Sequence, residues 1–411
     1  MNCTRECLKC GYCGSLEILD TFAWKSDFEP RSGFGIVIDI GTTNVVVALH
    51  NLKSGGVIAL FSCANPQREY GADVISRIEA ANKGYLTTLQ NLITEAISIG
   101  IDTTLNHGLY LEKIYLENVS KDKEALTSHA KIDKNTTEIV IAGNTTMIHL
   151  LLGASCESLG QFPFKPAFKI DTKYELFGQP TQIIPWFSAF VGGDILAGLV
   201  SVLPRGKKRF LLIDLGTNGE IVLYNNGSLI VTATAAGPAF EGSGSGYSAS
   251  MILDNLAKLI CDGVIDATGL ITDNFDPSMS NDSVTKTSPL TFTQKEVRDL
   301  QLAKSAVRSG LEILLNKSGL NYNDLDSVFL AGGIGQAMNV DSAITVGLLP
   351  IEIKEKVVPV GNVSLAGAVR FLLSPNKAKN DMETLLANFT EVNLAECEFF
   401  NELFMKYLSF S

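Results

Sequence analysis

Two short strings of the sequence join an acidic residue, a glycine and hydroxyl or amide side chains directly after an apolar run. They are Asp39-Ile-Gly-Thr-Thr and Asp214-Leu-Gly-Thr-Asn. Glycine lets a backbone turn approach phosphate oxygens closely, threonine adds a hydroxyl donor, and the aspartate can hold a hydrated magnesium ion. Each string therefore predicts a phosphate-binding turn, with the candidate residues Asp39, Gly41, Thr42, Thr43, Asp214, Gly216, Thr217 and Asn218.

Short β-branched runs on both sides of each string must position these turns. Gly35 to Ile38 predicts a buried strand that delivers the first aspartate, and Asn44 to Leu49 predicts the returning strand. Phe210 to Ile213 and Glu220 to Tyr224 predict the same pair around the second string. Each string is therefore expected at the tip of a β-hairpin.

The two parts of the chain remain similar beyond these hairpins. Ile139-Val-Ile-Ala-Gly-Asn parallels Val328-Phe-Leu-Ala-Gly-Gly. Val191-Gly-Gly-Asp-Ile-Leu-Ala-Gly parallels Val360-Gly-Asn-Val-Ser-Leu-Ala-Gly. Three strand-to-glycine junctions in the same order predict two copies of one α/β domain that face each other across a nucleotide cleft.

Size and charge narrow the function classes. A chain of 411 residues is long enough for two to three domains, and a hydrophobic share of 46% supplies their cores. The net charge of -11 disfavours nucleic acid and anionic membranes as partners, since both need a concentrated basic face. Met1 is not followed by the apolar stretch of a signal peptide, and Ala189 to Leu203 is too short and too interrupted to span a membrane. We expect a cytoplasmic protein.

Four of the eight cysteines lie within the first thirteen residues, at Cys3, Cys7, Cys10 and Cys13. In a reducing compartment such clustering indicates metal ligation, which predicts an iron-sulfur cluster, most simply [4Fe-4S], with zinc as the alternative. In a ferredoxin run the fourth cysteine serves another cluster. A variant therefore remains in which three cysteines bind the cluster and the fourth ligand comes from elsewhere in the chain or from the second subunit of a homodimer.

The pattern predicts four segments. The cysteine-rich module is too small for a core and would need its metal to hold a shape. The segments are residues 1–32 for this module, 33–203 and 204–375 for the two α/β halves, and 376–411 for an extension that packs on them.

Short sequence patterns predict several further helices, strands and loops. Thr293-Gln-Lys-Glu has the spacing of a capping box and predicts a helix through Asn316. The polar stretch from Thr272 to Thr293 predicts a loop. A short strand at Phe389 to Leu394 is expected to lead into an aromatic-rich helix. His149, within an apolar helix, is expected to be a core histidine.

The sequence does not support other nucleotide-binding motifs. The sequence contains no G-x-x-x-x-G-K-[ST] string, which argues against a P-loop ATPase. The Gly242-Ser-Gly-Ser-Gly-Tyr run lacks the βαβ setting of a dinucleotide fingerprint. The paired hairpins remain the best candidate.

With these motifs the chain resembles the superfamily of acetate and sugar kinases, heat-shock ATPases and actin over about residues 33 to 373. The resemblance implies an actin-like, ribonuclease H-like α/β fold that binds ATP and Mg²⁺. It makes Asp39 to Thr43 and Asp214 to Asn218 the phosphate loops and Ala331 to Gly335 the loop at the adenosine. Asp194 falls where such enzymes orient the attacking water or hydroxyl, with a helix N-cap as the alternative.

This resemblance completes the set of candidate site residues. Glu220 and Glu241 are expected near the γ-phosphate, where they could assist proton transfer. The candidate catalytic residues are Asp39, Asp194, Asp214 and Glu220. The further candidates for nucleotide binding are Gly237, Gly332, Gly333 and Gly335.

One branch of the superfamily is more similar, the ATP-dependent reductive activators of corrinoid proteins. The strings that carry this resemblance are Tyr70-Gly-Ala-Asp-Val-Ile-Ser-Arg-Ile, Gly143-Asn-Thr-Thr-Met-Ile-His, Ala235-Ala-Gly-Pro-Ala-Phe-Glu-Gly and Gly361-Asn-Val-Ser-Leu-Ala-Gly-Ala. The resemblance implies reduction of a Co(II) corrinoid to Co(I) on a partner corrinoid protein of a methyltransferase system. Electrons would come from reduced ferredoxin or a similar donor through an iron-sulfur module, assisted by ATP hydrolysis.

The chain departs from this family in two respects. Family members carry a larger ferredoxin-like domain at one end. They also have a longer insertion between Pro238-Ala-Phe-Glu-Gly and Gly244-Ser-Gly, two strings that nearly abut here. The alternatives left open are a small-molecule kinase, a nucleotide-switched binding module, and an activator of 2-hydroxyacyl-CoA dehydratase-type enzymes.

Overall fold

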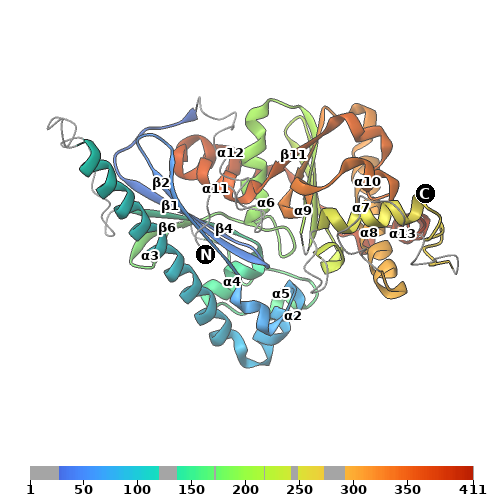
Figure 1. Cartoon of the computed structure of the whole chain (residues 1–411), viewed down its shortest axis with the longest axis horizontal. Helices are drawn as coiled ribbons and strands as arrows, with labels where there is room; N and C mark the ends of the chain where they lie inside the picture. The colour runs from blue at the N-terminus through green and yellow to red at the C-terminus, as the bar shows by residue number, and fades with distance from the viewer. Residues whose placement is uncertain are drawn as a thin grey trace. The chain divides into compact units, whose positions relative to one another are not determined.

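The computed structural model describes residues 27–119, 137–170, 173–216, 218–241, 249–272 and 292–410 (Figure 1). Contacts divide the chain into two compact units. The first comprises residues up to Gly206 together with Asn362–Phe389, and the second comprises Lys207–Gly361 and Thr390–Ser411. The four N-terminal cysteines, Thr217 and most of the loop expected at residues 272–293 lie outside the described residues.

The first unit is built on a six-stranded mixed sheet with the order β3-β2-β1-β4-β6-β5. Strand β1 pairs antiparallel with β2 and parallel with β4, so a hairpin and a crossover connection meet at this strand. The strands are β1 (Phe34–Ile40), β2 (Asn44–Asn51), β3 (Val57–Ala64), β4 (Glu138–Gly143), β5 (Tyr174–Leu176) and β6 (Gln179–Ile183).

Helices cover both faces of this sheet, which explains why β1 is a continuous apolar run. Alternate residues of β1, such as Ile36 and Ile38, join a core that also includes Leu89 of α3. Gly35 on the opposite face approaches Leu372 of α11. The helices are α2 (Val74–Ala80), α3 (Leu86–Val119), α4 (Thr145–Leu152), α5 (Glu157–Gly160), α6 (Gly193–Val202), α11 (Val363–Leu373) and α12 (Pro375–Ala387), with short turns η3 (Pro66–Tyr70), η4 (Ala81–Tyr85) and η7 (Leu203–Arg205).

The second unit has a six-stranded mixed sheet with the order β11-β10-β7-β8-β9-β12. Its strands are β7 (Arg209–Leu215), β8 (Gly219–Asn225), β9 (Ser228–Thr234), β10 (Ser327–Ala331), β11 (Val357–Gly361) and β12 (Phe389–Glu391). Its helices and turns are α7 (Ala249–Cys261), α8 (Gln294–Ser318), α9 (Gly332–Ala337), α10 (Val340–Thr345), α13 (Phe400–Lys406), η8 (Gly237–Glu241), η9 (Tyr322–Asp324), η10 (Ile351–Lys356) and η11 (Leu394–Glu396).

The internal repeat is visible in the two topologies. Five strands of the first sheet, β3-β2-β1-β4-β6, have the same order as β9-β8-β7-β10-β11. The registers also match, because Asp39 lies opposite Ala142 on β4 and Asp214 lies opposite Ala331 on β10. The α/β fold and the four strands predicted for the two hairpins are confirmed.

Helices α11 and α12 lie in sequence between β11 and β12 of the second sheet but pack in the first unit. The repeat pattern places residues 363–375 in the second half, whereas α11 packs against β1, β4 and α6. The segment 376–411, expected as one extension, divides between α12 on α6 and α13 on α8. Pairing of α11 with α6 brings two small-residue helices into backbone contact, which a pattern along the chain does not reveal.

Several local predictions are confirmed. The capping box starts α8, with the Glu296 carboxylate accepting from the Thr293 amide at 2.7 Å, and a left-handed Gly319 ends it. His149 is fully buried, with its Nδ1 2.7 Å from the Thr145 carbonyl and its Nε2 accepting from the Ala167 amide at 3.1 Å.

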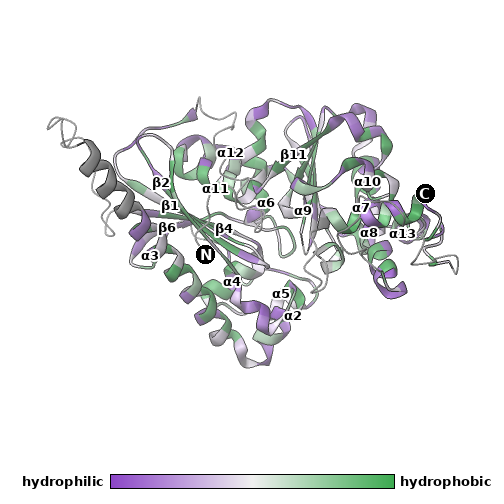
Figure 2. Cartoon of the chain, viewed as in Figure 1, coloured by the Kyte–Doolittle hydropathy of each residue, from purple (hydrophilic) through white to green (hydrophobic). Residues whose placement is uncertain are grey.

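The hydropathy of the residues agrees with this arrangement of strands and helices. Figure 2 shows the central strands as mainly hydrophobic, and α3 as a helix of alternating hydrophobic and hydrophilic segments. Within the described ranges, no helix combines the length and apolar character that crossing a bilayer requires.

Gly367→Ala should separate α11 from α6. A Cβ at Gly367 would lie 1.8 Å from the Ala197 carbonyl oxygen, a backbone atom that cannot rotate away. We expect a loss of about 3 kcal/mol in unfolding free energy, measured by denaturant titration. Gly333→Ala in α9, where a Cβ would meet nothing within 4 Å, is the control and should change stability by less than about 1 kcal/mol. Equal stability of the two variants would contradict this packing.

Lys304 predicts a pH dependence of stability. Its ammonium donates to the Ser409 carbonyl at 2.6 Å and lies over the ring of buried Phe410, and burial followed by nearby Arg308 lowers its pKa from 10.5 to about 8. Between these two values the unfolded chain binds more protons, so this residue's contribution to stability rises as pH increases from about 8 to 10.5. Unfolding free energies of the wild type and Lys304→Met should therefore diverge in favour of the wild type over this range. A constant difference would exclude the effect.

Candidate functional site

The first hairpin turn joins β1 to β2. Asp39 lies at the end of β1 with 6% exposure, and the Gly41 amide closes the turn by donating to the Asn44 carbonyl at 2.9 Å. Thr42 is also buried. A backbone hydrogen bond therefore closes the turn, and the residues Asp39 and Thr42 are shielded from solvent.

Three side chains donate hydrogen bonds to carbonyl or hydroxyl groups of this turn. The Asn65 amide donates to the Gly41 carbonyl at 2.9 Å, and the Arg77 guanidinium donates to the Thr42 carbonyl at 2.6 Å. Asn144, the N-cap of α4, donates to the Thr42 hydroxyl at 3.1 Å.

These bonds orient the peptide groups of the turn. In a planar trans peptide the carbonyl of one residue and the amide of the next point in opposite directions. The amides of Thr42 and Thr43 therefore point away from the groups that hold the Gly41 and Thr42 carbonyls. Successive amides that share one side of a turn are suited to an anion such as phosphate.

The Asp39 carboxylate lies between two donors at the N-terminus of α11. Asn362 donates to one oxygen and Ser364 to the other, each at 2.7 Å. Asn362 is also the N-cap of α11, because its own oxygen accepts from the Leu365 amide at 2.8 Å. Burial raises the pKa of Asp39, and these two hydrogen bonds offset that effect only in part.

Neither Asn362 nor Ser364 was predicted as a site residue. Both lie in the Gly361-Asn-Val-Ser string, which supported the internal repeat and the family resemblance but no site assignment. A polar pair at a strand-to-helix junction was the available signal, since such residues either cap the helix or face a ligand. Asn362 does the first and also contacts Asp39.

Asp194 lies near the same turn. It occupies the first turn of α6, where its carboxylate accepts from the Ile195 amide at 2.9 Å, and Gly192 is the N-cap. A Cβ at Gly192 would lie 2.5 Å from the Asn144 Cα and 2.6 Å from an Asp194 oxygen. Asp194 is therefore adjacent to Asn144, the residue that binds Thr42.

The second hairpin turn joins β7 to β8 and is also closed by a glycine amide, which bonds to the residue two positions on rather than three. The Gly216 amide donates to the Asn218 carbonyl at 2.9 Å, and Asp214 lies opposite Glu220 across the hairpin. Glu220 is buried, with 7% exposure.

Gly332 lies in close contact with this second turn. Its φ is +79°, and a Cβ there would lie 2.5 Å from an Asp214 oxygen and 2.6 Å from the Leu215 carbonyl oxygen. Only glycine fits this position. The structure thus brings together two predicted segments of the second unit, the turn after β7 and the glycine-rich start of α9, which contains Gly333 and Gly335.

Gly237 lies close to the base of the same hairpin. It begins η8 with a φ of +65°, and it follows Ala236, whose Cβ is 3.4 Å from the Cβ position of Gly219. The side chain of Glu241 is not described.

Nothing in the described part of the chain replaces the N-terminal cysteines as a metal site. Across the described residues, no group of three or more His, Cys, Asp or Glu side chains is arranged to hold a metal ion. The described cysteines Cys63, Cys156, Cys261 and Cys397 are free thiols.

Comparisons with known proteins agree with this arrangement. The chain is 31% identical to the corrinoid activation enzyme RamQ of Eubacterium limosum over 86% of its own length and 66% of that relative. It is 24% identical to the [Co(II) methylated amine-specific corrinoid protein] reductase of Methanosarcina barkeri over 92% of this chain and 77% of the relative. The chain thus spans just under two thirds of the length of RamQ.

A solved structure has the same fold. The reductive activator for corrinoid, iron-sulfur protein superposes with a TM-score of 0.76 at 28% identity, covering 93% of this chain and 67% of that one. Two family models divide the chain at the junction of the two sheets. The RACo middle region matches residues 34–115 and 105–203, and the C-terminal domain of RACo, the ASKHA domain, matches residues 208–251 and 245–411. Because these consecutive models together match most of its length, the chain belongs to the RACo family and carries an ASKHA domain.

Proposed function

We propose that this protein is an ATP-hydrolysing reductive activase that returns the inactive Co(II) corrinoid of a partner protein to Co(I). One electron per cobalt passes from a reduced ferredoxin or similar donor through an iron-sulfur cluster on the N-terminal cysteines. The observation that carries the proposal is the pair of equivalent hairpin turns, each with a buried or half-buried aspartate at the end of a parallel strand, in a RACo family chain.

The phosphate sites follow from the two turns. The amides of Thr42 and Thr43 each point away from the side chain that holds the preceding carbonyl, and the turn after Asp214 is the counterpart of this turn in the second unit. We propose that both turns bind the phosphates of one ATP, with Gly332, Gly333 and Gly335 at its adenosine.

The residues present also fit a magnesium ion. Burial raises the pKa of Asp39 because two hydrogen bonds do not fully offset the loss of water around its carboxylate. A nearby divalent cation favours the ionised form of such a carboxylate, and Mg²⁺ prefers oxygen ligands. Asp39 and Asp214 would hold the hydrated ion, which neutralises phosphate charge when bound.

Asp194 and Glu220 are the candidates for orienting the attacking water. Asp194 belongs to the first unit beside Asn144, and Glu220 faces Asp214 across the second hairpin. We assign the main role to Asp194, because it lies beside Asn144, which donates to the Thr42 hydroxyl.

The corrinoid partner is inferred from the relatives. RamQ is named a corrinoid activation enzyme, and the second relative is named a reductase of a Co(II) corrinoid protein. The physical requirement is that ATP favours an arrangement in which the donor cluster and the corrinoid approach each other, and that hydrolysis resets it.

Activation is tested directly by mixing the protein without oxygen with a Co(II) corrinoid protein, a reduced donor and Mg·ATP, and following the corrinoid absorption. We expect Co(I) to accumulate with ATP and not with a non-hydrolysable analogue. Phosphate transfer to a metabolite would favour the kinase alternative, and nucleotide binding without turnover would favour the binding-module alternative.

Asp214→Asn should leave the protein folded and lower ATP hydrolysis by about a hundredfold or more, because it removes a charge at the metal site. Asp39→Asn should have a similar effect, and the double variant should be no worse than either single one, since residues that act as a unit are not additive. The assay is phosphate release. Asp262→Asn, at an exposed position of the second unit, is the matched control. Unchanged hydrolysis in Asp214→Asn would contradict the assignment.

Protein purified without oxygen should contain iron and sulfide in stoichiometric amounts and show absorption that bleaches on reduction. Single Cys→Ser changes at Cys3, Cys7, Cys10 and Cys13 should each lower the iron content. The control is Cys261→Ser, which alters an exposed free thiol. Zinc in place of iron would exclude electron transfer through this segment, and loss of iron in only three variants would identify a fourth ligand elsewhere.

A further inference from the structure

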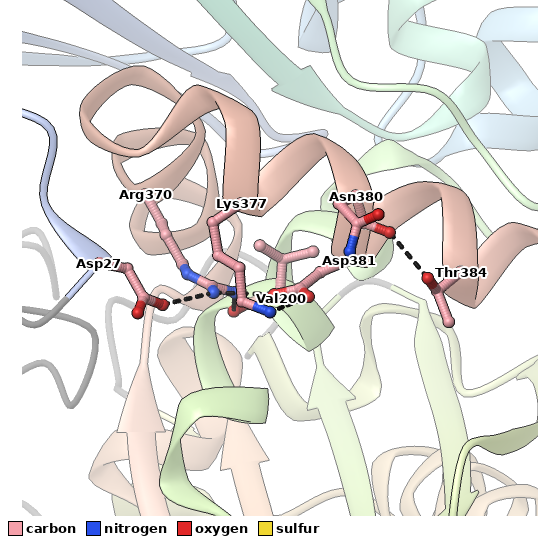
Figure 3. Close-up of polar contacts among 7 residues, drawn as sticks. All are labelled: Asp27, Val200, Arg370, Lys377, Asn380, Asp381 and Thr384. Carbon is pink, nitrogen blue, oxygen red and sulfur yellow. Dashed lines mark hydrogen bonds and ion pairs between the residues drawn. The ribbon is translucent and has the colours of Figure 1, made fainter.

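Arg370 is a buried arginine that joins three segments of the first unit. It lies in the last turn of α11 and its side chain is 1% exposed. One terminal nitrogen donates to the Val200 carbonyl of α6 at 2.7 Å. The other contacts Asp27 at 2.9 Å and Asp381 of α12 at 2.8 Å (Figure 3).

The charges in this cluster balance. Lys377 pairs with the second oxygen of Asp381 at 3.2 Å, so two cations face two carboxylates. Burying ions costs free energy that their pairing barely recovers, and replacement by apolar side chains is often as stable. The cluster is therefore poorly explained by stability alone. Its effect is to fix which segments meet at this end of α11.

Asp27 begins a segment that caps α11, residues Asp27–Arg31, here called the connector. The Glu29 amide donates to the Leu373 carbonyl at 3.0 Å, and the Arg31 guanidinium donates to the Leu372 carbonyl. The last carbonyls of a helix have no partner within the helix. The connector thus supplies donors to the C-terminal end of α11.

The opposite end of α11 holds Asp39 through Asn362 and Ser364. A helix of eleven residues is about 16 Å long. Gly367, between the two ends, brings α11 into backbone contact with α6 at Ala197. A helix packed this closely moves as one body, so its two ends are mechanically joined.

We propose that Arg370 is a positioning residue that couples the connector, and with it the cysteine-bearing segment that precedes it, to the Asp39 carboxylate through α11. The inference rests on the proposed function in that Asp39 is there assigned to the nucleotide site. Coupling between two sites is reciprocal. Nucleotide at Asp39 then alters the docking of the connector, and the state of the N-terminal segment alters the binding of nucleotide.

Asp27 and Asp381 provide a matched comparison. Both pair with the same nitrogen of Arg370, at 2.9 and 2.8 Å, but only Asp27 belongs to the connector. Asp27→Ala removes one ion pair of Arg370, and Asp381→Ala removes another together with the ion pair of Lys377, so Asp381→Ala is the larger disturbance of the cluster but leaves the connector's own ion pair in place. Asp27→Asn and Asp381→Asn, which keep the side-chain shape, repeat the comparison if either alanine variant is unstable.

The measurement is hydrogen–deuterium exchange of the full chain without nucleotide. In Asp27→Ala we expect amide exchange in residues 362–369, at the Asp39 end, to accelerate by about fivefold or more, and in Asp381→Ala we expect little change there. Ser364→Ala should reciprocally accelerate exchange of the Glu29 amide. If Asp27→Ala affects only residues 27–33 and the last turn of α11, or if both aspartate variants behave alike, the coupling is wrong and the cluster is merely structural.

A second arm adds Mg²⁺ and a non-hydrolysable ATP analogue, with binding measured by calorimetry. Exchange in residues 27–33 should change in the wild type, and the change should disappear in Asp27→Ala although the analogue still binds. Binding without any response in the wild type would overturn the coupling. Failure of the analogue to bind would contradict the proposed function instead, and the comparison without nucleotide would still decide the role of Arg370.

Discussion

The buried carboxylate of Asp39 is the interaction on which the first unit depends. Removing a carboxylate from water is costly, and here the compensating donors come from Asn362 and Ser364, more than three hundred residues along the chain. These hydrogen bonds help to hold α11 against the sheet of the first unit, although α11 follows β11 of the second sheet in sequence. The pKa of Asp39 remains raised by burial, so compensation is incomplete and the site is suited to a cation.

The approach of α11 to Asp39 depends in turn on small residues. Gly35 on β1 leaves room for Leu372, and Gly367 lies against the backbone of Ala197. Larger side chains at these positions would lift the helix from the sheet and withdraw Asn362 and Ser364 from the carboxylate. Gly367 ends the repeated string Val360-Gly-Asn-Val-Ser-Leu-Ala-Gly, so one glycine of the internal repeat also allows long-range packing.

The sequence allowed prediction of those features that depend on neighbouring residues. The hairpins around Asp39 and Asp214 follow from alternation and turn chemistry, and the helix at residues 294–318 follows from its capping box and apolar stripe. Arg77 lies in a string that carries the family resemblance, yet the role of Asn65 and Arg77 in holding Gly41 and Thr42 requires contacts across 24 and 35 residues. No local pattern specifies such pairs. The packing of α11 in the first unit was missed for the same reason, because it depends on contacts between residues that lie far apart in the sequence.

The two ends of α11 differ in the kind of interaction they make. The Asp39 end uses neutral donors, which leave the negative charge available to a cation, whereas the Arg370 end neutralises every charge within its own cluster. This difference suits the proposed coupling. A cation that binds at Asp39 acts on one end of α11, and the response appears at the other end, in the position of the segment that Arg370 holds. An apolar residue at position 370 would make no ion pair with Asp27 or Asp381 and would leave the Val200 carbonyl without this donor. The buried charge therefore joins the connector and α12 to the same end of α11.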